Sequence, residues 1–230
     1  MKDPINKDVT DLDLKEIFEQ IKVLNSALNQ LGLDIFNEET KYKRLSKISH
    51  FVFAIIHRAI ELNRGFLTLS ESNNWITAVS LIRLQADNCM RFHALNLVED
   101  KVFFYNQVTS GVSIRDIKDS KGNKMWDGYL ATELDKLFPF FKTIYNNTSG
   151  LIHFSEEHIK IGSDLYENKD NPDKDFLLYI RFSESREFPI YEKVDYAFNM
   201  HQLGKLLYQL IHDYKIVVIK IMKQIEKGSK

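Results

Sequence analysis

The stretch LSKISHFVFAIIHRAIEL, residues 45–62, is strongly apolar and decides the fold class. Its apolar residues recur at every third or fourth position, which is the period of an α-helix with one buried face. The strictly apolar run inside it, FVFAII, is far shorter than the roughly 20 residues of a membrane-spanning helix. We therefore expect a long helix over residues ~39–71 that packs in the core of a helical protein and does not enter a membrane.

The same helical period covers most of the chain on either side of this stretch. Pro139 interrupts the period. Because proline is disfavoured inside a helix but suits its first turn, a new helix is expected to start there. The stretch SGVSIRDIKDSKGNKMWDG, residues 110–128, is polar and contains glycine, which predicts a surface loop. The remaining helices are expected at ~9–32, ~74–97, ~99–109, ~127–138, ~140–153 and ~193–227.

One region departs from the helical pattern. The stretches HIKIG, residues 158–162, and FLLYIRF, residues 176–182, indicate two short strands joined by a polar loop. A two-stranded hairpin is marginal by itself, so we expect it to lean on the helices. The sequence predicts a mainly α protein, a helical bundle with a small β-hairpin insertion near residues 158–182. It forms a single domain over residues 1–230, with the insertion occupying about 156–190.

The composition of the chain indicates its cellular compartment and the kind of partner that it binds. The 230-residue chain has a formal net charge of −1, which argues against a strongly nucleic-acid-binding surface. Cys89 is the only cysteine, so no disulfide forms within the chain, as is typical of a reducing compartment. The polar N-terminal sequence does not resemble a secretory signal. We therefore expect a cytoplasmic protein.

A polar ladder lies within the predicted helix ~74–97. Arg83, Asp87 and Arg91 are four residues apart, so Asp87 can pair with either arginine on one helix face. Arg83 falls at the edge of the apolar face, where an unpaired charge is costly, and Asp87 is its local candidate partner. Two interpretations are open at this stage: an ordinary surface ion pair, or a half-buried pair that faces another helix.

The stretch YNNTSGLIHFS, residues 145–155, carries the second group of polar residues. Tyr145, Ser149 and His153 are four apart and share one helix face. Histidine is the usual general acid or base near neutral pH. The Ser–His pair lacks a nucleophile elbow and an orienting acid, which disfavours a serine hydrolase. Neither the Glu-x-x-His pairs of a di-iron bundle nor a glycine-rich phosphate loop occurs, so no metal and no cofactor is predicted.

Taken together, LIRLQAD at 81–87 and YNNTSGLIH at 145–153 resemble a group of uncharacterised bacterial helical proteins. In that group an Arg-x3-Glu helix is followed by a Tyr-x3-Ser-x2-Ile/Val-His helix. These proteins are similar in turn to the HEPN superfamily, all-helical proteins common in toxin–antitoxin and phage-defence systems. The resemblance covers about residues 45–158. It implies a site composed of Arg83, Asp87, Tyr145, Ser149 and His153.

The chain departs from this pattern at two places. The acid of the first motif is Asp87 rather than glutamate. Active HEPN ribonucleases also share an Arg-x4–6-His motif on one helix, and residues 146–148 of this chain, which would hold that arginine, are Asn, Asn and Thr. The resemblance therefore leaves open whether the chain is an enzyme, with Arg83 from another helix as the replacement cation.

Three functions follow as expectations. The first is an HEPN-like interaction or regulatory module of a bacterial phage-defence or toxin–antitoxin system, in which the polar residues lock two helices together. The alternative is a metal-independent endoribonuclease, with His153 as base at a ribose hydroxyl and Arg83 at the phosphate. The third is a small-ligand-binding bundle with a pocket lined by aromatic residues. The resemblance implies a homodimer or a partner protein, and RNA is the ligand of the ribonuclease alternative.

Overall fold

The computed structural model describes residues 9–150, 156, 159, 162–167, 176–182 and 187–228. The helices are α1 (Asp11–Lys41), α2 (Lys47–Glu71), α3 (Trp75–Leu97), α4 (Lys101–Thr109), the short 3-10 helix η1 (Ile114–Asp116), α5 (Asp127–Leu137), α6 (Phe141–Ser149) and α8 (Ile190–Gly228). The strands are β1 (Ser163–Glu167) and β2 (Phe176–Ile180). The protein is mainly α, a helical bundle with a small β-hairpin insertion, as the sequence predicts.

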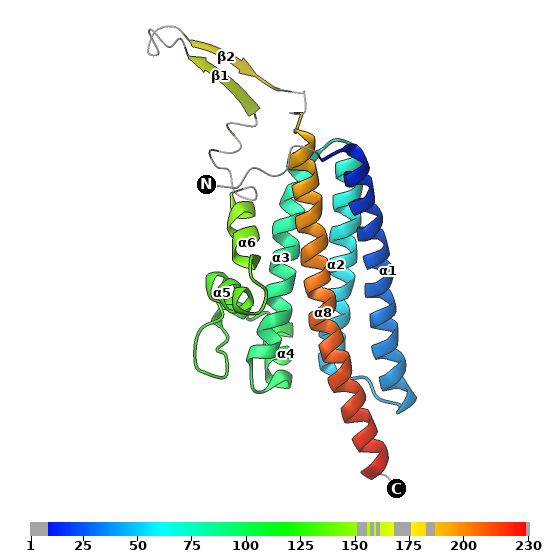
Figure 1. Cartoon of the computed structure of the whole chain (residues 1–230). Helices are drawn as coiled ribbons and strands as arrows, with labels where there is room; N and C mark the ends of the chain where they lie inside the picture. Colours follow the sequence, from blue (N-terminus) through cyan, green and yellow to red (C-terminus); the bar gives the residue numbers. More distant parts are fainter. Residues whose placement is uncertain are drawn as a thin grey trace.

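Four long helices, α1, α2, α3 and α8, lie side by side and form the bundle (Figure 1). Helix α8 packs against both α1 and α3, and α2 packs against both α1 and α3 as well. The buried face of α1 follows the helical period closely. Its buried apolar residues are Phe18, Ile21, Leu24, Leu28, Leu31 and Ile35. Burial of such stripes stabilises the bundle by the hydrophobic effect.

Side chains just before the helices fix where three of them begin. Ser46, Asn74 and Asp100 precede α2, α3 and α4, and each accepts a hydrogen bond from a backbone amide three residues later. Such caps satisfy amides that the helix itself leaves unpaired. Asn74 thus fixes the start of α3 at Trp75, close to the start that the sequence predicts near residue 74.

The boundary between the first two helices differs from the prediction. Helix α1 continues to Lys41 instead of ending near residue 32, and α2 begins at Lys47 rather than near residue 39. Glu39 explains both shifts, because it is buried at the end of α1 and accepts hydrogen bonds from the amide and hydroxyl groups at the start of α2. The chain turns between the two helices at Lys43, whose φ is 54°.

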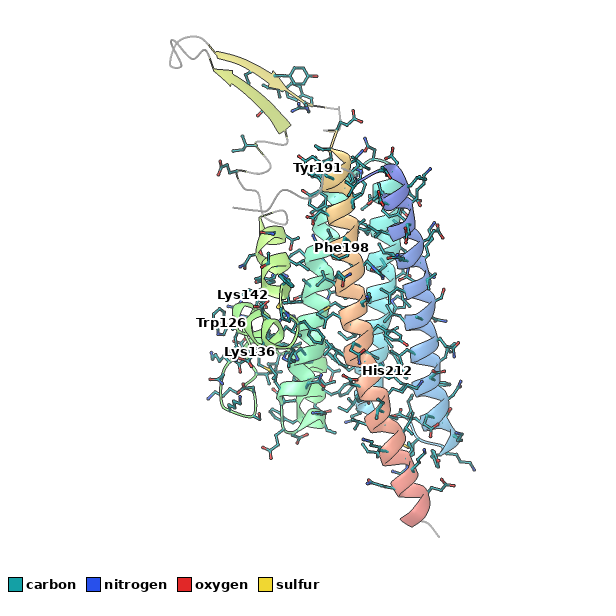
Figure 2. The ribbon with its side chains drawn as sticks, viewed as in Figure 1. Trp126, Lys136, Lys142, Tyr191, Phe198 and His212 are labelled. Carbon is teal, nitrogen blue, oxygen red and sulfur yellow. The ribbon has the colours of Figure 1, made fainter. Side chains whose placement is uncertain are left out.

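Helices α5 and α6 pack together against α3 (Figure 1). The break expected at Pro139 is confirmed, because α5 ends at Leu137 and α6 starts at Phe141. Lys142 joins the two helices, since its amide donates to Asp135 and its ammonium donates to Thr132 of α5. Figure 2 shows Lys142 beside α5. The predicted helix ~140–153 is described as far as Gly150, and the rest lies outside the described residues.

The first strand is not where the sequence placed it. Strand β1 occupies Ser163–Glu167, inside the stretch expected to be a loop. Of the predicted strand at 158–162, residues 159 and 162 are helical, and the other three lie outside the described residues. Strand β2 covers Phe176–Ile180, within the predicted range of 176–182. Register is set by the partner strand rather than by local composition, and Leu165 lies opposite Leu178 in the antiparallel pair. The hairpin is also expected to pack against the helices. Leu178 of β2 is 45% exposed, so the described residues do not show this packing.

The loop between η1 and α5 contributes side chains to the core. Ile117 and Met125 are buried in the core, although the surrounding sequence is polar. Asp119 holds this loop in place by accepting hydrogen bonds from the amides of Lys121 and Asn123. The prediction of a surface loop over this stretch is therefore wrong for Ile117 and Met125, which lie in the core on either side of this turn.

No helix in the part of the chain that the structure describes is long and apolar enough to cross a membrane.

Candidate functional site

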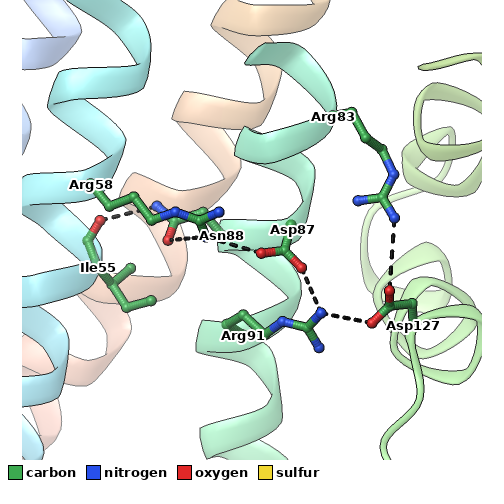
Figure 3. A network of polar contacts seen from close by, with 7 residues as sticks. All are labelled: Ile55, Arg58, Arg83, Asp87, Asn88, Arg91 and Asp127. Atoms are coloured by element: carbon green, nitrogen blue, oxygen red, sulfur yellow. Dashed lines mark hydrogen bonds and ion pairs between the residues drawn. The ribbon is translucent and has the colours of Figure 1, made fainter. Parts of the chain in front are cut away.

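The face of α3 that carries the polar ladder lies between α2 on one side and α5 and α6 on the other (Figure 3). Each of these three neighbours packs directly against α3. A charged side chain on this face is therefore only partly in contact with water, and it needs partners from the adjacent helices. This position favours the second of the two sequence interpretations, a half-buried ion pair that faces another helix.

Asp87 is bound from two directions. One oxygen lies 2.6 Å from Nη2 of Arg91, one helical turn further along α3, and the other accepts from Nη1 of Arg58 in α2 at 3.0 Å. The side chain of Asp87 is 18% exposed, so little of it contacts water. The expected pair between Asp87 and Arg91 is confirmed. The expected pair between Asp87 and Arg83 is wrong, because the carboxylate turns toward α2 instead.

Asp127, the first residue of α5, continues the chain of charges. It accepts a hydrogen bond of 2.7 Å from Arg91, and its other oxygen lies 3.9 Å from Nη2 of Arg83. A carboxylate in the first turn of a helix is also favoured by the helix dipole. Positive and negative groups thus alternate from α2 across α3 to α5 (Figure 3).

The electrostatic balance of this cluster is positive. Three guanidinium groups, those of Arg58, Arg83 and Arg91, face the two carboxylates of Asp87 and Asp127. Burial alone would lower the pKa of Arg91, but the two carboxylates outweigh it and raise that pKa. Arg91 is therefore held firmly in its charged form. We call the five residues the charge cluster.

Arg83 is the most buried member of the charge cluster. Its side chain is only 8% exposed, and its Cζ lies 4.0 Å from the centre of the Tyr145 ring in α6. A desolvated cation over an aromatic face gains about 2 kcal/mol. Among the described residues, its Nε is buried without a hydrogen-bond partner. Arg83 and Tyr145 are thus neighbours on packed helices, whereas the guanidinium retains one donor that no described group uses.

The other predicted site residues take different positions. The hydroxyl of Ser149 donates to the carbonyl oxygen of Tyr145 at 2.7 Å, within its own helix, and does not bond Arg83. His153 lies outside the described residues, so its closeness to Arg83 remains a prediction. The structure therefore brings together Arg83 and Tyr145, and it links Asp87 to Arg83 only indirectly, through Arg91 and Asp127.

Sequence reasoning missed Arg58, Asp127 and Asn88. Asn88 is buried and donates to the carbonyl oxygen of Ile55 at 3.0 Å, and it also accepts from Arg58 at 3.4 Å. An arginine within the apolar stretch of residues 45–62 is a signal for Arg58, because a charge on a core helix needs a partner. For Asp127 the sequence offers no comparable signal.

Two reactive residue types are buried in α3. The thiol of Cys89 donates to the carbonyl oxygen of Leu203 at 3.4 Å, and burial raises its pKa, so the reactive thiolate is disfavoured. Burial lowers the pKa of His93, and neither ring nitrogen has a hydrogen-bond partner within the part of the chain that the structure describes. Among the described residues, His, Cys, Asp and Glu side chains do not gather in threes as a metal ion would require.

Comparison of the chain with protein-family models, with curated proteins and with solved structures gives no match.

Proposed function

We propose that this chain is an HEPN-like interaction or regulatory module of the kind that acts in bacterial phage defence or toxin–antitoxin pairs. In this proposal the charge cluster positions helices and does not perform chemistry. The observation that carries the proposal is the unbroken alternation from Arg58 through Asp87 and Arg91 to Asp127, which joins α2, α3 and α5. A carboxylate with both oxygens already bound by arginines is poorly suited to act as a base.

The alternative with specific support is a metal-independent endoribonuclease. Arg83 favours it, because no group in the described part of the chain accepts from its buried Nε, and a phosphate oxygen would accept from it. Tyr145 stacks on that arginine from α6, the helix whose sequence leads to His153. In this alternative His153 removes the proton from a ribose 2′-hydroxyl, and Arg83 stabilises the negative charge that develops on the phosphate.

The two functions make opposite predictions for Arg83→Ala and His153→Ala. If these residues hold the helices together, each change leaves partners unsatisfied and lowers the free energy of unfolding by about 1–3 kcal/mol. We expect this result in urea denaturation. We also expect no cleavage of single-stranded RNA by the wild-type protein in EDTA.

Arg64→Ala is the matched control. Arg64 is a 67% exposed arginine that pairs with Glu61 on the surface, so its loss removes the same charge without disturbing a buried group. The control should melt close to the wild-type temperature. Metal-free cleavage that both Arg83→Ala and His153→Ala abolish, at unchanged melting temperature, would overturn the module and support the ribonuclease.

The regulatory part of the proposal is tested by co-expression with the product of the adjacent gene. We expect the two proteins to copurify at a fixed stoichiometry. Arg83→Ala should weaken that complex only as far as it destabilises the bundle. A chain that copurifies with neither neighbouring gene product would argue against a role within a toxin–antitoxin pair.

A further inference from the structure

Strand β2 and the residues just after it leave apolar side chains uncovered. Leu178, Ile180 and Phe182 are 45%, 48% and 93% exposed. Leu178 and Ile180 are two residues apart in β2, so they project from the same face of the strand, and Phe182 follows at a bend just after it. The hairpin lies beyond one end of the helical bundle (Figure 1). Clustered exposed apolar side chains of this kind mark a surface that binds another molecule.

The backbone of β2 has a definite orientation. The amide of Arg181 donates to the carbonyl oxygen of Gly162 at 2.9 Å, and Ser163 lies opposite Ile180 in the next pair. In an antiparallel ladder, hydrogen-bonded and non-hydrogen-bonded pairs alternate along the strands. Every second residue of β2 therefore directs its amide and carbonyl groups toward β1, and the residues between them direct theirs away.

The outward-directed residues of β2 are Phe176, Leu178 and Ile180. In the described part of the chain the sheet has two strands, and no further strand accepts these backbone groups. An unpaired edge with an apolar face is a template for another strand, and a two-stranded hairpin gains stability when strands are added.

The two edges of the hairpin differ in charge. Strand β1 contains Asp164 and Glu167, whereas β2, FLLYI, contains no charged residue. Charged residues on an edge strand oppose the addition of a further strand. An edge without charge can pair with itself at no electrostatic cost, so β2 is the edge suited to a second copy of the same chain.

We propose that β2 pairs antiparallel with β2 of a second copy, across a two-fold axis at Leu178. This register places Phe176 opposite Ile180 of the partner subunit and joins the two hairpins into a four-stranded sheet. It pairs all five residues of β2, and the three outward-directed ones become hydrogen-bonded pairs. Every cross-strand pair is apolar or aromatic, which is stabilising. The contact is small, so association is weak, and it is independent of the charge cluster and hence of the proposed function.

The two-fold axis at Leu178 provides a direct test by charge complementation. In Leu178→Lys and in Leu178→Glu, each dimer would bring two like charges face to face. We expect each variant to associate at least about tenfold more weakly than wild type in sedimentation velocity over a range of concentrations. An equimolar mixture of the two variants should recover association, because lysine then faces glutamate. Recovery in the mixture also shows that both variants are folded.

Two prolines provide the matched backbone control. Leu178→Pro removes an amide that points away from β1, and Leu165→Pro removes the equivalent outward amide of β1. Both leave the bonds inside the hairpin intact. We expect only Leu178→Pro to weaken self-association. A wild-type chain that stays monomeric at all concentrations, or association that neither the Leu178 variants nor Leu178→Pro reduce, would overturn the proposal.

Discussion

His93 is a buried histidine on α3 whose two ring nitrogens have no hydrogen-bond partner among the residues that the structure describes. Burial lowers its pKa from the ordinary value of 6.5, and the nearby charge of Glu133 opposes this only in part. The folded protein therefore binds fewer protons at this position than the unfolded chain does below pH 6.5. By linkage, the stability contributed here is complete above pH 6.5 and is lost as the pH falls toward the lowered pKa.

We expect His93→Leu to flatten this pH dependence. The variant should be at least as stable as wild type at neutral pH, because an unsatisfied polar group is replaced by an apolar one. Its urea midpoint should fall less than the wild-type midpoint between neutral and mildly acidic pH. Some fall remains, because burial also lowers the pKa of His201. His212→Leu, at a position 41% exposed, is the control and should keep the wild-type slope.

At the scale of elements, the helices could be predicted because their signals are local. Apolar spacing and the capping residue Asn74 lie within the segments that they define. The partner of Arg83 could not be predicted in this way. Asp127 lies on another helix, and the contact exists only because α5 packs against α3. Asp87, the local candidate partner of Arg83, instead pairs with Arg58 of α2. Which arginine Asp87 binds depends on which helices pack together.

The position of strand β1 could not be predicted from its local sequence either. Residues 163–167, SDLYE, are not more strand-like in composition than the stretch HIKIG before them. Their state is decided by pairing with β2, which begins nine residues after β1 ends. A strand is thus specified jointly by two segments, whereas a helix is specified largely by one.

Two glycines inside helices test how closely α1 packs against α8 and against α2. A Cβ at Gly204 in α8 would lie 2.6 Å from Cδ2 of the buried Leu24, whereas a Cβ at Gly32 in α1 would meet Ile56 at an ordinary 3.4 Å. Gly32→Ala should therefore stabilise the protein by about 0.5–1 kcal/mol through helix propensity. Gly204→Ala should lose that gain to crowding and lower the stability.

Thermal melting followed by circular dichroism measures both glycine variants. The measurement distinguishes the sites because the two substitutions are chemically identical and both lie inside helices. Equal stabilisation at both positions would show that α1 and α8 do not approach as closely at Gly204 as the structure indicates.

At the scale of the whole molecule, the bundle and the hairpin make their contacts separately. The buried core is formed chiefly by the helices, and β1 and β2 contact chiefly each other. We expect that replacing the two strands with a short Gly-Ser linker leaves a mainly helical circular dichroism spectrum and a melting temperature within a few degrees of wild type. A loss of several degrees would show that the strands support the bundle. The same variant should no longer self-associate.

The packing of α8 against α1 has a consequence for synthesis on the ribosome. The apolar stripe of α1 emerges early, but the helix that covers much of it begins at Ile190, about 150 residues after α1 ends at Lys41. At roughly 5–20 residues per second, translation of the intervening chain takes about 7–30 s. During that interval the nascent chain exposes an apolar surface of the kind that chaperones recognise. Release before α8 is made therefore favours aggregation and degradation over a smaller folded protein.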